Sequence, residues 1–309
     1  MTERYPSTVF VVIPVFNRLE ETLSCINDLR RQRYPNVEIV VVDGGSTDGT
    51  VAELQKVSDV HLIWGVGEQW WTGATWLGID HALARAGDDD FVMLLNNDTA
   101  FGPEMLEVLV EESLRLDAAV APIARAADGS VVNAGTWIDW STYVIEQRMS
   151  EPDVAESTWS VGVLEGRGSL VPVRAIRAAG YVERVRLPHH AADYEFSLRI
   201  ARHGCALMMT NRTSITVDWD VPVLMRYHDR ASIRRIWWEL TNRRSFVSIP
   251  VHFSLIDLAC RDRGRWKLKV RFLRRTAVQM APRTQAWQLA VRVRTSLRRR
   301  YSLHQTGSR

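Results

Sequence analysis

Short apolar runs rich in β-branched residues alternate with helical patterns through the first third of the chain. Four of these runs indicate buried parallel strands: residues 9–13, 38–42, 61–66 and 91–95. Three helical patterns separate them: residues 20–32, 51–57 and 76–86. Strand, helix and strand in repeated order predict an α/β fold, a mostly parallel, doubly wound sheet flanked by helices, which binds ligands at the C-terminal ends of its strands.

The pattern changes after the fourth strand. Residues 120–170 mix short strands with turns, and helical patterns return at 175–180 and 194–203. With 309 residues, of which 46% are hydrophobic, the chain can bury a large core. This second half is expected to complete the same fold.

Cysteines and apolar runs bear on the cellular compartment. The three cysteines are far apart and show no C-x-x-C spacing, so neither a disulfide framework nor a zinc site is indicated. The apolar run at 9–16 contains Pro14 and lacks a cleavage site, and it is interpreted as a strand and not a signal peptide. No window reaches the roughly 18 to 20 apolar residues of a membrane-spanning helix. A cytoplasmic protein that does not cross the bilayer is expected.

The C-terminal region is strongly basic. Residues 261–309 hold 15 Lys or Arg and one acid, Asp262, a net charge of +14 within a chain of net +3, which leaves −11 on residues 1–260. Aromatic and aliphatic residues interleave with the arginines, and residues 245–260 are largely apolar. This pattern predicts a basic amphipathic helical extension, residues 246–309, following a domain of residues 1–245. Association with the inner membrane face is the favoured interpretation, and a solvated helical face or a disordered tail is the alternative. No base-reading module supports nucleic-acid binding.

Two acidic turns follow predicted strands. Asp98, in Asn96-Asn97-Asp98-Thr99, follows the fourth strand, where a carboxylate can hold Mg²⁺ or Mn²⁺ against a diphosphate. The alternative is a plain turn before the helix near Pro103. Asp43 closes the second strand and precedes two glycines, so a ligand can approach the backbone closely. Its alternative role is capping the helix that starts near Thr50.

Together with Ile13-Pro14-Val15-Phe16-Asn17-Arg18 and Ala192-Asp193-Tyr194-Glu195, these turns resemble the family 2 glycosyltransferases, inverting enzymes of the GT-A (Rossmann-like) fold that use nucleotide sugars. The resemblance covers residues 8 to 245 and lies in the order and spacing of the motifs. The N-N-D-T form of the acidic turn is most similar to the rhamnosyltransferase and galactofuranosyltransferase branches.

The resemblance implies a set of binding residues. Those expected to bind the donor and its nucleotide are Pro14, Phe16, Asn17, Arg18, Asp43, Trp71, Gly73 and Asn97. Trp71 and Gly73 belong to a glycine-containing donor loop at 70–75. Asp98 is the expected metal ligand, joined by His228, although a lone histidine is more often structural.

Asp193 is the expected general base, because direct displacement at an anomeric carbon needs a base within reach of the acceptor hydroxyl. The segment departs from the family's E-D-x-D pattern: Ala192 replaces a glutamate and Glu195 replaces the second aspartate. The choice between Asp193 and Glu195 therefore stays open, and an ion pair of Glu195 with Arg199 is the structural interpretation of that glutamate.

The predicted function is an inverting, metal-dependent glycosyltransferase. It would move a rhamnose- or galactofuranose-like sugar from a UDP- or dTDP-sugar to a cell-envelope glycan or polyprenyl-linked acceptor. The alternative is a non-catalytic nucleotide-sugar or membrane-surface binding subunit, in which Ala192 and Asn97 mark lost catalysis.

Overall fold

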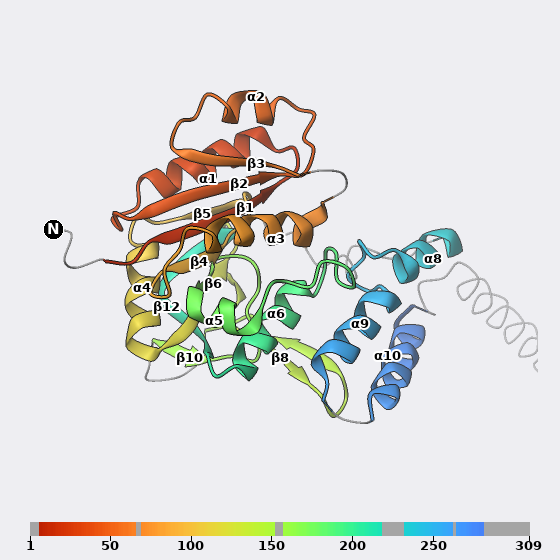
Figure 1. Ribbon diagram of the computed structural model, residues 1–309. Coiled ribbons are helices and arrows are strands. Elements are labelled where there is room, and N and C mark those ends of the chain that lie inside the picture. The colour runs from red at the N-terminus through yellow and green to blue at the C-terminus, as the bar shows by residue number, and fades with distance from the viewer. Residues whose placement is uncertain (1–5, 66–68, 152–156, 218–231, 262–263, 281–309) are drawn as a thin grey trace, which may run out of the picture.

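The computed structural model describes residues 6–65, 69–151, 157–217, 232–261 and 264–280, and within these it forms a ten-stranded sheet (Figure 1). Four parallel strands make up its first half. In spatial order they are β3 (Val60–Trp64), β2 (Val37–Asp43), β1 (Val9–Val15) and β4 (Phe91–Leu94). Because these strands are parallel, their C-terminal ends meet at one edge, where the sequence places Asp43 and Asp98.

The second half of the sheet mixes strand directions. Strand β11 (Ser169–Pro172) runs antiparallel between β4 and β6 (Ala118–Arg125), and β12 (Ala206–Val217) lies parallel to β6. The shorter strands β5 (Thr99–Phe101), β7 (Val131–Asn133) and β10 (Thr158–Ser160) pair with β12 or β6. A separate ribbon joins β8 (Thr136–Asp139) and β9 (Val144–Gln147).

Helices cover both faces of the sheet, because successive strand residues point to opposite sides. Val11 and Ile13 pack with α1 (Leu19–Arg30), α2 (Thr50–Leu54) and α4 (Met105–Leu116). Val12, between them, packs on the other face with α3 (Trp70–Leu83), α5 (Val173–Ala179) and α6 (Ala192–Arg202). The observed α/β architecture with a mostly parallel central sheet confirms the fold predicted from the sequence.

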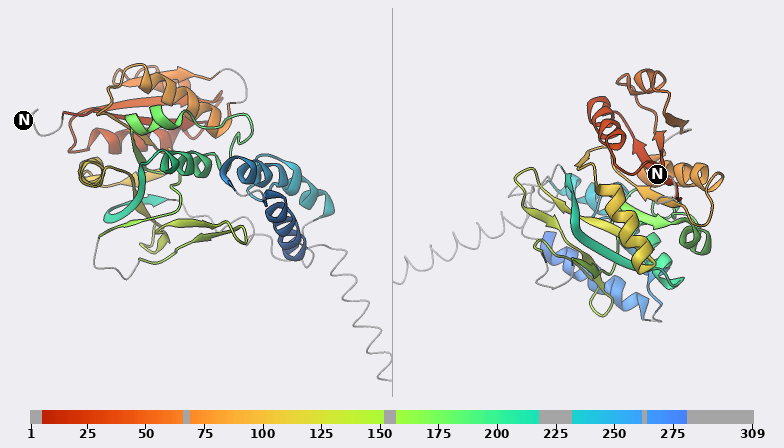
Figure 2. Two further views of the ribbon diagram at one scale, coloured as in Figure 1. Left: turned by 60° about the horizontal axis from the view of Figure 1, so that its bottom comes forward. Right: turned by 90° about the vertical axis from the view of Figure 1, so that its left-hand side faces the viewer.

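Three further helices gather at the end of the molecule away from α2 (Figures 1 and 2). They are α8 (Ile233–Thr241), α9 (Ile249–Ala259) and α10 (Arg265–Met280). The apolar residues of α9 share a core with α6, α10 and the β8–β9 ribbon, in which Tyr143 is fully buried. The apolar segment predicted at 245–260 is therefore a core helix. The division of the chain at residue 245 stays a prediction, and residues 281–309 lie outside the described part.

One element begins earlier than the sequence indicates. The helix expected from residue 76 starts at Trp70, so Trp71 and Gly73 lie in a helix and not in a loop. Glycine in a helix costs about 1 kcal/mol relative to alanine. A Cβ added at Gly73 would lie 2.7 Å from Oε1, the end of the flexible Gln69 side chain. Among the described residues, none of the helices has the length and apolar character needed to cross a bilayer.

Candidate functional site

The ends of β1 and β2 form the first part of the site. Asp43 is only 4% exposed, and its Oδ2 accepts hydrogen bonds from the backbone N–H groups of Gly45 (2.9 Å) and Ser46 (3.0 Å). Phe16, directly after β1, is 63% exposed beside Gly44, whose added Cβ would lie 3.8 Å from Phe16 Cβ. Asp43 and the exposed ring of Phe16 therefore lie beside two glycines, Gly44 and Gly45, which have no side chains to block the approach of a ligand.

The loops after β1 and β2 hold one another. Asn17 and Arg18 both have left-handed backbone conformations, with φ of 59° and 64°. The Asn17 N–H donates to Ser46 Oγ (2.6 Å), and Asn17 Oδ1 accepts from the Thr47 N–H (2.9 Å). Asn17 thus fixes the β2–α2 loop. Pro14 lies within β1, paired with β2.

The acidic turn after β4 sends its three polar side chains in different directions. Asp98 Oδ2 accepts from Arg18 Nη1 at 2.6 Å, and both side chains are partly exposed. Asn97 is 8% exposed and donates to Thr22 Oγ1 of α1 (2.9 Å), so its amide anchors the turn. Asn96 Oδ1 accepts from Trp71 Nε1 (2.9 Å). A donor contact through the Asn97 side chain stays a prediction.

The donor set fits a divalent cation that binds together with a substrate. Among the described residues, no group of three His, Cys, Asp or Glu side chains converges on one point. Mg²⁺ and Mn²⁺ sites that serve phosphate substrates commonly use one or two carboxylates and complete the shell with phosphate oxygens and water. The partly exposed carboxylate of Asp98 meets this requirement once Arg18 moves aside. His228, the second predicted ligand, lies outside the described residues.

Trp71 connects the acidic turn to the other half of the site. While its Nε1 bonds Asn96, its six-membered ring lies against Gly166: a Cβ added there would lie 2.2 Å from Trp71 Cζ2. The Gly166 N–H in turn donates to Asp193 Oδ2 at 3.0 Å. One series of contacts therefore runs from the turn bearing Asp98 to Asp193.

Sheet topology explains why this loop lies beside the acidic turn. Strand β11 is antiparallel to β4, so it begins where β4 ends, and Ser169 pairs with Leu94. The Gly168 N–H donates to the Leu94 carbonyl at 2.7 Å. The loop of residues 165–168 is thereby held at the same sheet edge as Asp43 and Asp98.

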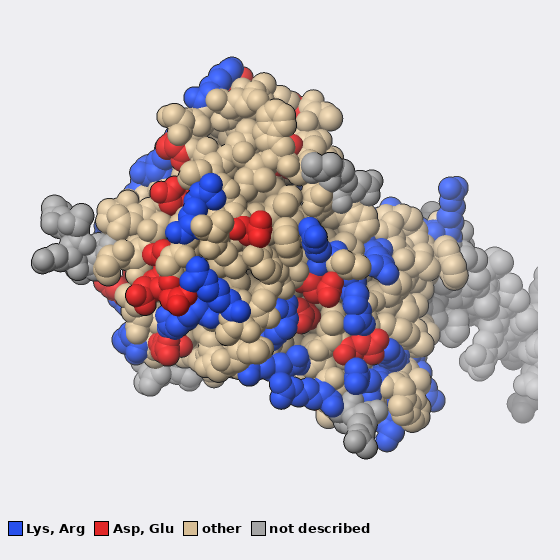
Figure 3. Space-filling view, viewed as in Figure 1, with Lys and Arg blue, Asp and Glu red and all other residues tan. Residues whose placement is uncertain are grey.

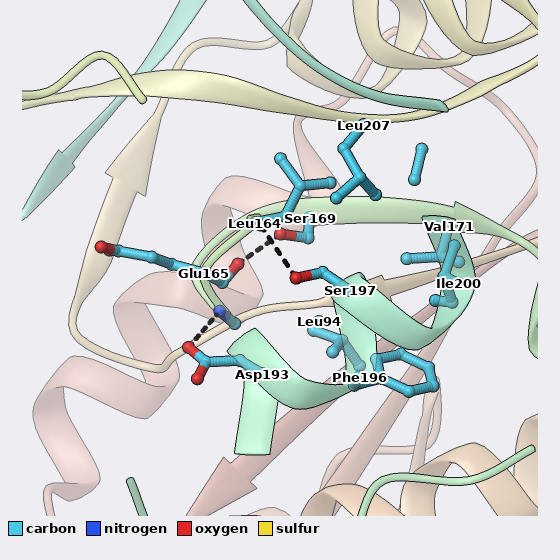
Figure 4. Close-up of a pocket in the computed structure, with 12 residues that line it drawn as sticks. Leu94, Leu164, Glu165, Ser169, Val171, Asp193, Phe196, Ser197, Ile200 and Leu207 are labelled. Atoms are coloured by element: carbon cyan, nitrogen blue, oxygen red, sulfur yellow. Dashed lines mark hydrogen bonds between the residues drawn. The ribbon is translucent and has the colours of Figure 1, made fainter. Parts of the chain in front are cut away.

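Asp193 lies in the first turn of α6, with its carboxylate directed at the backbone of the loop before β11 (Figure 4). Burial in this largely apolar pocket raises the pKa of Asp193 to about 6, and the Gly166 N–H bond opposes that rise. The negative charge of Glu165 raises the pKa further, and the guanidinium of Arg167 lowers it. A carboxyl group with a pKa near neutrality suits a general base.

Glu195 has a different environment. It is 3% exposed, and its two oxygens accept from Arg199 Nε (2.9 Å) and Nη2 (2.8 Å) in a bidentate ion pair within α6. Arg199 also donates to the carbonyl of Tyr181. Glu195 therefore holds α6 in place, and this geometry favours Asp193 as the base, an assignment that stays a proposal.

Two site residues carry roles that the sequence did not assign. Gly166 gives the backbone donor for Asp193 and the space for the Trp71 ring, and Asn96 orients the indole. The only signal in the sequence is that Gly166 and Gly168 directly precede an apolar strand. The arrangement places the carboxylates of Asp43 and Asp98 at one sheet edge and connects that edge to Asp193, whose pKa is raised. A transfer reaction between a phosphorylated donor and a hydroxyl would need groups of these kinds close together.

Comparison with known proteins agrees with this chemistry. The family model for glycosyl transferase family 2 matches residues 10–161. The succinoglycan biosynthesis protein ExoA of Rhizobium meliloti is 25% identical over 236 residues, 74% of this chain and 66% of that protein. The N-acetylglucosaminyl-diphospho-decaprenol L-rhamnosyltransferase of Mycobacterium tuberculosis is 34% identical over 112 residues, 31% of this chain and 34% of that protein. The chain thus matches two thirds or less of the length of these relatives.

Solved structures share the fold at low sequence identity. GalNAc-T7 crystallised with UDP, GalNAc and Mn²⁺ superposes with a TM-score of 0.55 at 15% identity, covering 87% of this chain and 54% of that one. S. aureus TarS 1–349 in complex with UDP gives a TM-score of 0.54 at 14% identity, covering 88% and 72%. The family model, the relatives and the shared architecture lead to one conclusion: the chain belongs to glycosyltransferase family 2 and has the GT-A fold.

Proposed function

We propose that the protein transfers a sugar from a nucleotide diphosphate donor to an acceptor hydroxyl with inversion at the anomeric carbon. The observation that carries this proposal is the series of contacts from the acidic turn through Trp71 and Gly166 to Asp193. This series of contacts supports the proposal because it connects the proposed leaving-group site at Asp98 with the proposed base, Asp193. An inverting displacement needs both groups, on opposite sides of the reacting carbon.

The nucleotide is proposed to bind at the ends of β1 and β2. Asp43 would accept from the base or ribose, with Phe16 beside the base and Pro14 and Asn17 lining the pocket. UDP or dTDP is the proposed nucleotide, and two structures of the same fold were crystallised with UDP. Trp71 and Gly73 would lie against the sugar and diphosphate.

Asp98 would hold the divalent cation, Mg²⁺ or Mn²⁺, and Arg18 would turn from Asp98 to the diphosphate. When bound, such a cation stabilises the negative charge that develops on the departing diphosphate. GalNAc-T7, which shares the fold, was crystallised with Mn²⁺. His228 is proposed as a further ligand.

In the displacement, Asp193 would take the proton of the acceptor hydroxyl while that oxygen attacks the anomeric carbon. The bond between this carbon and the phosphate oxygen breaks, and its electron pair leaves with the nucleoside diphosphate. Gly166 holds Asp193 Oδ2 through its N–H, and within the described ranges Oδ1 accepts only from the neighbouring Tyr194 N–H, at 2.9 Å. The glycosidic product forms with inverted configuration, and the proton remains on Asp193.

The sugar is proposed to be rhamnose- or galactofuranose-like, and the acceptor a cell-envelope glycan or a polyprenyl-linked glycan. The rhamnosyltransferase of M. tuberculosis, whose name specifies a diphospho-decaprenol acceptor, supports this choice. A polyprenyl-linked acceptor lies at the membrane surface, so we propose a cytoplasmic protein bound peripherally to the inner membrane face.

The test is nucleotide release by the purified full chain with Mn²⁺ or Mg²⁺ across UDP-, dTDP- and GDP-sugars, with free and polyprenyl-linked glycan acceptors. Asp193→Asn should lower turnover by about 100-fold or more, the usual contribution of a general base. Asp98→Asn should make release insensitive to added metal. Glu146→Gln, an exposed charge change on the β8–β9 ribbon, is the matched control.

Metal-dependent release from one donor, lost in both variants and kept in the control, would support the proposal and identify the sugar. If binding of a nucleotide sugar is measurable but no acceptor supports release, the protein is a binding subunit on the same fold. Full turnover by Asp193→Asn would refute the mechanism.

A further inference from the structure

Helix α10 has two apolar faces, and the described part of the chain covers one of them. Leu268 and Phe272 are buried against the core that α9 and the β8–β9 ribbon share. On a second face lie four exposed apolar residues, which we call the outer stripe: Trp266, Val270, Leu273 and Ala277. Their spacing of four, three and four residues places them in one line along the helix.

The outer stripe is exposed along the described helix. Trp266 is 63% exposed, Val270 42% and Leu273 37%. Scattered exposed apolar residues are ordinary, but a continuous line of them on one helix marks an interaction surface. Helix α8, at the same end of the molecule (Figure 2), exposes Trp237 and Trp238 as well.

The charges of α10 determine what kind of partner fits. Its six charged residues are all Lys or Arg, and Figure 3 shows such side chains gathered toward the lower right, where α9 and α10 lie. Four of them have partners that fix them on the protein: Arg265 and Lys269 on Asp257, and Arg271 and Arg275 on the carbonyl oxygens of Ser141 and Tyr143.

Lys267 and Arg274 differ from these four. By helical geometry they border the outer stripe, and Lys267 Nζ lies 5.9 Å from the Trp266 ring. Neither has an acidic partner within the described part of the chain. The helix therefore combines a line of apolar side chains with unpaired cations beside it, the pattern of helices that lie in the interface of an anionic bilayer.

We propose that the outer stripe of α10 is the surface by which the protein docks on an anionic membrane, with α10 lying flat and Trp266 at the headgroup level. This deepens the membrane association proposed above by assigning it to a folded helix. Docking of a second copy through the stripe is disfavoured, because it would bring two helices that carry only positive charges together. The chain continues after α10 with seven arginines and no acid in residues 281–309, which adds to the same attraction.

The experiment is sedimentation of the full chain with vesicles of phosphatidylcholine alone or mixed with phosphatidylglycerol, without donor. The triple variant Trp266→Ser, Val270→Ser, Leu273→Ser should partition at least about tenfold less than wild type, because each side chain loses apolar area to bury. The matched control replaces Leu114 and Val185, exposed apolar residues elsewhere at 57% and 73%, by Ser. Wild type should bind the mixed vesicles and show slowed hydrogen exchange across 265–280 when bound.

The outcomes separate this proposal from its alternatives. Binding of the triple variant equal to wild type, with loss only when Arg298, Arg299 and Arg300 become Gln, would assign docking to the tail and overturn the proposal. A dimer in solution that the triple variant abolishes, with no vesicle binding, would assign the stripe to a second copy and overturn it too. Asp193→Asn should bind vesicles like wild type, so failure of docking and failure of catalysis are distinguishable.

Discussion

The burial of Asp193 has a measurable consequence for activity. A carboxyl group with an ordinary pKa of 3.8 is held at about 6 by loss of solvent, and the difference corresponds to about 3 kcal/mol at roughly 1.4 kcal/mol per pH unit. The folded state favours the acid form, so the base is available only as the pH rises past 6. At pH 5 about a tenth of the enzyme should be active, whereas an ordinary aspartate would be almost fully ionised.

The assay is kcat/KM for nucleotide release between pH 4.5 and 9, for wild type and two neighbouring charge variants. Glu165→Gln removes a negative charge that raises the pKa of Asp193, so the acid limb should move to lower pH. Arg167→Gln removes a positive charge that lowers this pKa, so the limb should move to higher pH. Glu146→Gln, on the exposed ribbon, should leave the limb unchanged.

Stability gives a second readout that needs no substrate. The pKa of Asp193 is raised in the folded protein, so between pH 3.8 and 6 its carboxyl group is neutral in the native state and charged in the unfolded chain. The contribution of Asp193 to the free energy of unfolding therefore falls as the pH rises through this window. Asp193→Asn should therefore be up to about 3 kcal/mol more stable than wild type at pH 7, with the difference vanishing near pH 3.8. An acid limb below pH 5, or charge variants that move it in the same direction, would refute the reasoning.

Three further expectations follow from contacts elsewhere. Gly166→Ala should lower the free energy of unfolding, measured in urea, by about 1–3 kcal/mol and should also lower turnover, because the added Cβ would lie 2.2 Å from a carbon of the Trp71 indole. Gly87→Ala is the control, since its Cβ would meet only an ordinary contact. His252 is buried with its pKa lowered to about 4, so it stays neutral while the histidine of the unfolded chain protonates. Its contribution to the free energy of unfolding should therefore fall by about 1.4 kcal/mol per pH unit from 6.5 toward 4, measured as the difference between wild type and His252→Gln, since Asp193 contributes with the opposite sign in both proteins. Arg18→Gln frees Asp98 from its ion pair and should tighten donor-free Mn²⁺ binding, measured by electron paramagnetic resonance, by no more than about fivefold, since exposed pairs contribute about 1 kcal/mol or less; unchanged binding would argue against Asp98 as ligand.

The sequence predicts the positions of strands better than the directions of side chains. Period and composition identify β1 to β4, and topology then brings Asp43 and Asp98 to one edge without knowledge of any contact. The same reasoning does not show which side chains of the turn at 96–99 face a ligand and which anchor the turn. The sequence does not show that the Asn97 amide donates to Thr22 on α1 and so anchors the turn, and a contact of Asn97 with the donor stays a prediction.

Packing decided the features that local patterns could not show. The resemblance predicts a donor loop at residues 70–75, yet these residues start α3, and the small ones among them, Thr72, Gly73, Ala74 and Thr75, are buried. The role of Gly166 depends on Trp71, which lies 95 residues earlier in the sequence, so no local motif contains it. The same holds for α9: the apolar composition of residues 245–260 predicts part of an amphipathic extension, and the sequence does not show that α6 and α10 share a core with it.

Trp71 gives a physical reason to expect that donor choice and base position are coupled in the mechanism proposed above. Its indole bonds Asn96 of the acidic turn and fills the space over Gly166, whose N–H donates to Asp193. The first turn of α3, which carries Trp71, is tied to the segment before α6 at a second point: the Thr72 N–H donates to the Pro188 carbonyl. A donor that moves the first turn of α3 should therefore also move Gly166 and the segment before α6, which hold Asp193 in place. Selection for one sugar and placement of the base then depend on the same few contacts, and a substitution at Trp71 should alter both together.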